Sequence, residues 1–174
     1  LSNLNLSNEV HDSVEDILYG LDPIRDFVHN PNFEDFLNFL RNDILRCELV
    51  LRYFPEFRNP LRQSSITGET PLQIAYNSRD RVIDMEVLLH YADLWDPELH
   101  SELNNYLDSA LFNGPYGPDY EMVRMLLNHG ANPNAVVNEN GYSIIDEFIY
   151  THDYKMIGLL SEYGATFELP EDLF

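Results

Sequence analysis

A short pattern of residues recurs along this chain and restricts the folds that the sequence can adopt. VRMLLNHGA returns as IGLLSEYGA, so that Gly130 and Gly164 lie 34 residues apart. The pattern also occurs upstream as MEVLLHYAD, where Ala92 takes the place of the glycine. Each copy has apolar residues at the spacing of one helix face, and a glycine can adopt the left-handed conformation that ends a helix. The recurrence therefore predicts a short amphipathic helix that ends in a tight turn.

A second signature precedes each of these predicted helices. In GETPLQIAY, Thr70 is placed to cap a helix and Pro71 suits its first position. GYSIIDEFI repeats this device with Ser143 as the cap, and NNYLDSALF is a weaker copy that predicts a cap at Asn105. The chain is therefore predicted to contain pairs of helices, each followed by an exposed turn.

These units resemble the ankyrin repeat. TPLQIA stands where that family has Thr-Pro-Leu-His-x-Ala, and LLNHGANPN is similar to the end of the family's second helix. The resemblance implies an all-α fold in which helix–turn–helix repeats stack into a solenoid. We expect repeats over residues 67–101, 102–139 and 140–174.

A degenerate repeat is expected over residues 33–66, which would make 33–174 the repeat domain. FEDFLNFL is predicted to be its first helix and VLRYFPEFRNP its second, with Phe57 in the place of the glycine. Residues 1–32 match nothing in the family and are expected to form an N-terminal helical cap, with one helix starting near Ser13.

The chain is strongly acidic, with 30 Asp and Glu against 10 Lys and Arg and a formal net charge of −20. From Tyr91 onward, 15 carboxylates face only Arg124 and Lys155. Such a field repels phosphate backbones and anionic lipid, so we expect neither nucleic acid nor a membrane as partner. The acidity serves either solubility or the steering of a basic protein, and composition leaves both open.

Motifs for catalysis or metal binding are missing from the sequence. It contains no H-E-x-x-H pair, no G-x-S-x-G elbow and no phosphate-binding glycine loop. His90 and His129 fall at predicted helix ends, where they are expected to be structural. Cys47 is the only cysteine, lies in an apolar helical pattern and favours a reducing cytoplasmic compartment. We therefore expect a chain that is not an enzyme and has no catalytic residue, no metal site and no cofactor.

Several aromatic residues fall where a repeat should expose them, in turns or near the ends of first helices. They are Trp95, Phe112, Tyr116, Tyr142 and Tyr150. Exposed Tyr and Trp are frequent anchors of protein interfaces, although Trp95 could also fold back on its own repeat. Ankyrin repeats bind partners through a concave face of turns and first helices, and this resemblance adds polar positions. These are Glu69, Asn77, Ser78, Asn113, Glu139 and Asn140.

The function favoured by these features is the binding of another protein through an acidic concave face. The partner is expected to be basic, and the chain is expected to be a monomer when unbound. An inhibitor or antidote that covers a basic active site fits this description. So does an effector delivered into a host cytosol. The alternative is a structural subunit of an assembly, or a scaffold domain of a larger complex.

Overall fold

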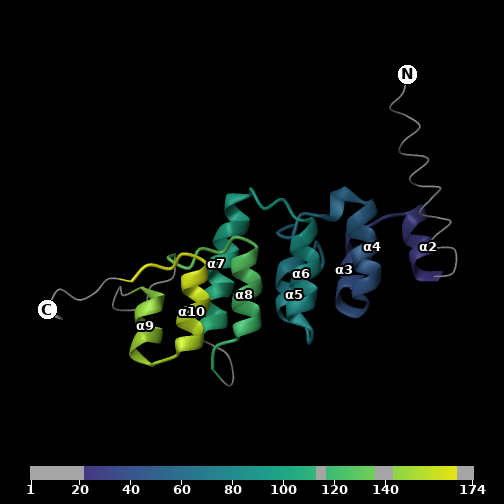
Figure 1. The fold of residues 1–174 in the computed structure, drawn as a ribbon. Helices are drawn as coiled ribbons and strands as arrows, with labels where there is room; N and C mark the ends of the chain where they lie inside the picture. Colours follow the sequence, from purple (N-terminus) through teal and green to yellow (C-terminus); the bar gives the residue numbers. More distant parts are fainter. Residues whose placement is uncertain (1–21, 113–116, 136–142, 168–174) are drawn as a thin grey trace, which may run out of the picture. The chain divides into compact units, whose positions relative to one another are not determined.

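The computed structural model describes residues 22–112, 117–135 and 143–167 (Figure 1). Helices are the regular elements of these residues and no strand occurs among them, which confirms the all-α fold. The chain divides into two compact units, Leu1–Asp93 and Leu94–Phe174, each with its own helix pairs. None of the described helices has the length and apolar character that crossing a membrane requires.

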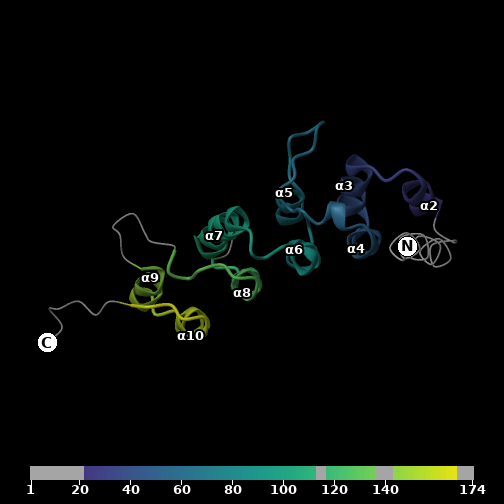
Figure 2. The same cartoon turned by 90° about the horizontal axis from the view of Figure 1, so that it is seen from above.

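In the first unit, residues 22–93 form two stacked pairs of α-helices, one further α-helix and a short 3-10 helix. Its elements are α2 (Asp22–His29), α3 (Phe33–Asn42), α4 (Ile44–Tyr53), the 3-10 helix η1 (Pro55–Phe57), α5 (Pro71–Tyr76) and α6 (Arg81–Tyr91). Helix α3 packs against α4, and α5 packs against α6. Contacts of α3 with α5 and of α4 with α6 join the two pairs. Figure 2 shows α3 and α5 in one row and α4 and α6 in the other.

Helix α4 begins earlier than the sequence pattern predicts. VLRYFPEFRNP was expected to be one helix from Val50, but α4 starts at Ile44 and ends at Tyr53. The Asp43 side chain accepts a hydrogen bond from the Arg46 N–H at 3.1 Å, which caps the start of the helix. Pro55 cannot continue a helix interior, because it lacks an N–H and its ring clashes with the preceding turn. The remaining residues form η1 instead.

An aromatic cluster replaces the glycine turn of this degenerate pair. Phe57 is buried, and its ring centroid lies 5.4 Å from that of Phe27 on α2 and 5.5 Å from that of Phe36 on α3. Phe27 also meets Phe39 and Phe54 edge to face, at 5.5 and 5.6 Å. Such ring pairs add stability beyond the apolar area that they bury. Helix α2 is therefore packed onto the first pair through Phe27, and through Val28, which is buried against Phe39, Leu49, Tyr53 and Phe54.

The second unit consists of two further pairs. Helix α7 (Pro97–Phe112) packs against α8 (Tyr120–Asn128), and α9 (Ile144–Tyr150) packs against α10 (Tyr154–Glu162). A stripe of apolar side chains on each helix packs against its partner helix in the pair. The fully buried ones include Leu103, Leu107, Met122, Val123, Leu126, Ile144, Met156 and Leu160.

The helix predicted to start after a cap at Asn105 begins nine residues earlier, at Pro97. The prediction of a cap at Asn105 is wrong, because this residue lies exposed inside a continuous helix of 16 residues. The Asp96 carboxylate accepts a hydrogen bond from the Glu98 N–H at 2.9 Å, and Pro97 supplies a preformed first helical residue. An Asp-Pro start is the stronger signal, so the helix extends back to it.

The predicted glycine stops are confirmed at both positions. Gly130 and Gly164 have φ values of 94° and 83°. The N–H of Ala131 donates to the Leu126 carbonyl at 3.0 Å, and that of Ala165 donates to the Leu160 carbonyl at 3.1 Å. This hydrogen bond across the last turn, with a left-handed glycine, is the Schellman motif.

Asparagine side chains connect successive turns of the second unit. Asn134 donates from Nδ2 to the Gly164 carbonyl at 3.0 Å, and its Oδ1 accepts from the Thr166 N–H at 2.8 Å. Asn104 on α7 accepts from the Asn132 N–H at 2.7 Å. These bonds satisfy turn backbone that the helices leave unpaired.

Candidate functional site

The loop ahead of α5, residues 61–70, is the most thoroughly braced surface loop of the first unit. Figure 2 shows it extending away from both helix rows. The Ser64 Oγ accepts hydrogen bonds from the Ile66 and Thr67 N–H groups at 3.1 and 3.0 Å. Ser64 is buried, so this hydroxyl organises the loop from within. We call residues 61–70 the Ser64 loop.

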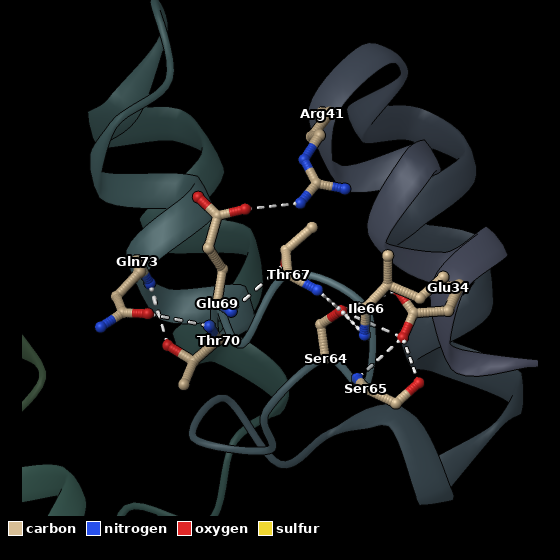
Figure 3. Close-up of polar contacts among 9 residues, drawn as sticks. All are labelled: Glu34, Arg41, Ser64, Ser65, Ile66, Thr67, Glu69, Thr70 and Gln73. Carbon is tan, nitrogen blue, oxygen red and sulfur yellow. Dashed lines mark hydrogen bonds and ion pairs between the residues drawn. The ribbon is translucent and has the colours of Figure 1, made fainter.

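Glu34 on α3 fastens this loop to the first helix pair (Figure 3). Its carboxylate accepts from the Ser64 Oγ at 2.9 Å, the Ser65 N–H at 3.0 Å and the Ser65 Oγ at 3.1 Å. Partial burial would raise the pKa of Glu34, but the hydrogen bonds from Ser64 and Ser65 outweigh it and lower the pKa. The loop is therefore tied to the ionised form of Glu34.

A second connection lies at the far end of the loop. Arg41 on α3 forms an ion pair with Glu69 at 2.9 Å. Thr70 and Gln73 then form a reciprocal capping box at the start of α5, with Thr70 as the cap that the sequence predicts. With both ends fixed, the tip of the loop is held away from the core.

The tip of this loop presents an apolar side chain that sequence reasoning did not single out. Ile66 is 76% exposed, although isoleucine is among the residues most often buried. Its neighbours in SSITGET are polar, so an isolated apolar residue inside a turn sequence was the available signal. Single exposed apolar residues are common, but this one stands on a loop that is held in one conformation.

The predicted contact residues of the first unit differ in how accessible they are. Asn77 is exposed at the end of α5, whereas Ser78 and Glu69 are half-buried. The Glu69 carboxylate is held by Arg41, so a partner would compete with an existing ion pair. Their role as partner contacts stays a prediction.

Ser78 lies beside a buried carboxylate on α6. Burial raises the pKa of Asp84, and the Ser78 hydroxyl offsets part of this rise although its geometry falls short of a full hydrogen bond. The side chain of Asp84 is enclosed between helices, so it offers no contact to a partner.

The predicted aromatic contacts of the second unit are accessible where the structure describes them. Trp95 is 91% exposed and Tyr150 is 82% exposed. Phe112 is 42% exposed and stacks on Phe148 with a centroid distance of 6.4 Å, so part of its ring stabilises the helix packing. The predicted contacts Asn113, Tyr116, Glu139, Asn140 and Tyr142 lie outside the described residues, as does the predicted helix near Ser13.

The turn between α9 and α10 carries further aromatic surface. Tyr154 at the start of α10 is 74% exposed, and the ring of His152 meets it edge to face at 6.2 Å. His152 has a φ of 60°, a conformation that residues other than glycine seldom adopt. The sequence reading included Tyr150 but not Tyr154 or the left-handed histidine.

The residues that were weighed as candidates for metal binding or reactivity lie in the following places. Within the described residues, no group of three His, Cys, Asp or Glu side chains is placed to hold a metal ion. Cys47 is buried as predicted, and burial raises the pKa of its thiol, which opposes formation of a thiolate. His90 and His129 lie in the last turn of α6 and at the C-cap of α8, as predicted.

The helix pairs of the second unit are also recognised by comparison with known families. A family model described as ankyrin repeats (many copies) matches residues 106–160, from within α7 to within α10. This match confirms, for residues 106–160, the resemblance to ankyrin repeats that was read from the sequence. Ankyrin repeats are in general non-catalytic modules of protein–protein interaction. No curated protein and no solved structure matches the chain significantly. The boundaries of the individual repeats stay predictions.

Proposed function

We propose that this chain is a non-catalytic module that binds one protein partner through side chains held out on its turns. The observation that carries the proposal is Ile66, an exposed apolar side chain on a loop fixed from both ends by Glu34 and Arg41. A contact residue that is already ordered loses little conformational entropy on binding. Trp95 and Tyr150 would add aromatic anchors of the kind that dominate interface energies.

The partner is proposed to be basic. Arginines of the first unit are engaged within the chain: Arg41 with Glu69, Arg46 with Asp43, and Arg52 with Glu48. Each such pair leaves the net charge of −20 unchanged. The field around the chain accelerates encounter with a cationic surface, while the apolar anchors set the dissociation rate. An acidic inhibitor that covers a basic active site is one form of this function. An effector acting in a cytosol is another.

Affinity capture with two matched variants tests this proposal. Ile66→Ser should lose the captured partner, because it removes the apolar anchor from the Ser64 loop. Leu45→Ser is the control, since Leu45 is an equally apolar, exposed side chain on α4. The partner should be retained by the control, and both variants should keep the wild-type melting temperature. Equal capture by wild type and Ile66→Ser would contradict the role of the loop.

The alternative of an assembly subunit gives a different result in the same preparation. Sedimentation of the purified chain should show a monomer, because copies that each carry −20 repel one another. Concentration-dependent self-association that persists at both low and high salt would favour the assembly subunit over the partner-binding module.

A further inference from the structure

The turn between α9 and α10, in the second unit, is another exposed surface feature. Tyr150 ends α9 and Tyr154 begins α10, and the two are 82% and 74% exposed. Ile149 is also exposed, at 42%. His152 lies between the two tyrosines. We call these four residues the tyrosine turn.

The tyrosine turn is held rigidly by its own backbone. The Asp153 N–H donates to the Phe148 carbonyl at 3.0 Å, and the His152 N–H donates to the Ile149 carbonyl at 3.2 Å. The Asp153 side chain caps α10 by accepting from the Met156 N–H at 3.0 Å. The two exposed rings are therefore displayed from a fixed support and lose little backbone freedom on binding.

A cation–π contact lies directly after this turn, at the start of α10. The Lys155 Nζ lies 4.0 Å from the centroid of the Tyr120 ring. The Tyr120 hydroxyl donates to Asp153, and this hydrogen bond raises the pKa of Tyr120 to about 12, so the ring stays neutral. An ammonium or guanidinium group is attracted to the face of such a ring.

The net charge of the sequence from Tyr91 onward favours a cationic occupant for this turn. From Tyr91 onward, 15 Asp and Glu accompany only Arg124 and Lys155, and both of these contact their own chain. Arg124 lies 3.9 Å from Glu162, and Lys155 covers Tyr120. A second copy of the chain brings the same negative charge and is disfavoured, whereas an arginine-bearing segment complements both the field and the tyrosine faces.

We infer that the tyrosine turn docks an arginine-rich segment of a protein partner, with guanidinium groups against the rings of Tyr150 and Tyr154. This inference rests on the proposed function and adds a surface and a chemistry to it. The carboxylates attract the arginine-rich segment at long range, and the two tyrosine rings determine where it binds.

A titration followed by NMR tests the inference on the full chain labelled with ¹⁵N. The probe is an acetylated and amidated (Gly-Arg)₅ peptide, with (Gly-Gln)₅ as the uncharged comparison. We expect the arginine peptide to shift the amide signals of residues 147–155 more than those elsewhere, and the glutamine peptide to leave them unchanged. Shifts spread evenly over the acidic residues would overturn the inference, even if the variants below failed to fold.

A variant that keeps the charge separates ring contact from simple attraction. The double variant Tyr150→Ser, Tyr154→Ser has the same net charge as wild type. It should bind the arginine peptide with an affinity lower by about fivefold or more. Leu45→Ser, which replaces an exposed apolar residue on α4, is the control and should bind the peptide as wild type does. An unchanged affinity of the double variant would overturn the inference, while loss of partner capture by Ile66→Ser alone would leave the proposed function standing. Dimerisation lost in the double variant would identify the turn as a self-contact and also overturn the inference.

Discussion

At the scale of single residues, His100 shows how a repeat is fastened to its neighbouring turn. Its Nδ1 lies 3.0 Å from the Gly130 carbonyl oxygen and its Nε2 lies 2.7 Å from that of Leu94. The ring thus fills the space beside a glycine that already has to be left-handed. The sequence alone does not reveal this role of His100, because its two carbonyl partners lie in different segments.

This packing predicts unequal effects at the two glycine stops. A Cβ at Gly130 would lie 2.8 Å from the His100 Cε1, whereas one at Gly164 would meet nothing within 4 Å. Gly164→Ala should cost about 1–2 kcal/mol of unfolding free energy, from its positive φ alone. Gly130→Ala should cost more, and chemical denaturation will measure both. Equal losses would show that His100 moves aside freely.

The connection of Glu34 to the Ser64 loop predicts a dependence of stability on pH. The pKa of Glu34 is lowered in the folded chain, so its ionised form stabilises the fold above the unfolded value of 4.5. This contribution is lost as the pH falls through the lower, folded value. Glu34→Gln should therefore melt below wild type at pH 7, and the difference should close at acidic pH. Glu56→Gln, on η1, controls for the loss of one charge.

If the gap between wild type and Glu34→Gln were the same at pH 7 and at a pH well below 4.5, the carboxylate would not be the group that holds the loop. Thermal unfolding followed by circular dichroism across this range is sufficient for the comparison.

At the scale of elements, local signals were reliable where one short segment carries all of the information. Thr70 and Pro71 are adjacent, and their places as cap and first helical residue were predicted directly, whereas the capping box that Gln73 completes was not. The stops at Gly130 and Gly164 are equally local, because each needs only the helix before it. Ser143 also occupies its predicted cap position, although its hydroxyl donates to Asp146.

Features that depend on contacts between residues distant in the sequence could not be predicted from local patterns. The exposure of Ile66 is set by Glu34, which lies 30 residues from its partner Ser64. Phe57 could be placed at a glycine position, but not in an aromatic cluster with Phe27 from outside the predicted repeats. A recurring cap was also missed, since Asp43, Asp119 and Asp153 each cap the second helix of a pair. Part of the acidity of the chain therefore serves helix starts.

The corrected start of α7 gives a prediction for that element. Asp96→Ala should cost about 1 kcal/mol, because it removes the acceptor for the Glu98 N–H. Asn105→Ala should be neutral or slightly stabilising, since alanine is the better residue inside a helix and Asn105 is exposed there. Urea denaturation of the two variants measures both changes in unfolding free energy. A larger loss for Asn105→Ala than for Asp96→Ala would contradict a helix start at Pro97.

At the scale of the whole molecule, charge is the property that the fold leaves unbalanced. Several arginines are engaged inside the first unit, by carboxylates or by rings such as that of Phe33, which Arg62 covers at 4.1 Å. The net charge of −20 therefore acts outward on whatever approaches. This charge is the basis of our proposal that the partner is cationic.

The association rate constant with the captured partner tests this account most directly. Measured by stopped flow between about 50 and 500 mM salt, it should fall by roughly tenfold or more, because salt screens attraction between opposite charges. The dissociation rate constant should change far less, since the apolar anchors set it. An association rate constant that is insensitive to salt would contradict a basic partner drawn to an acidic repeat surface.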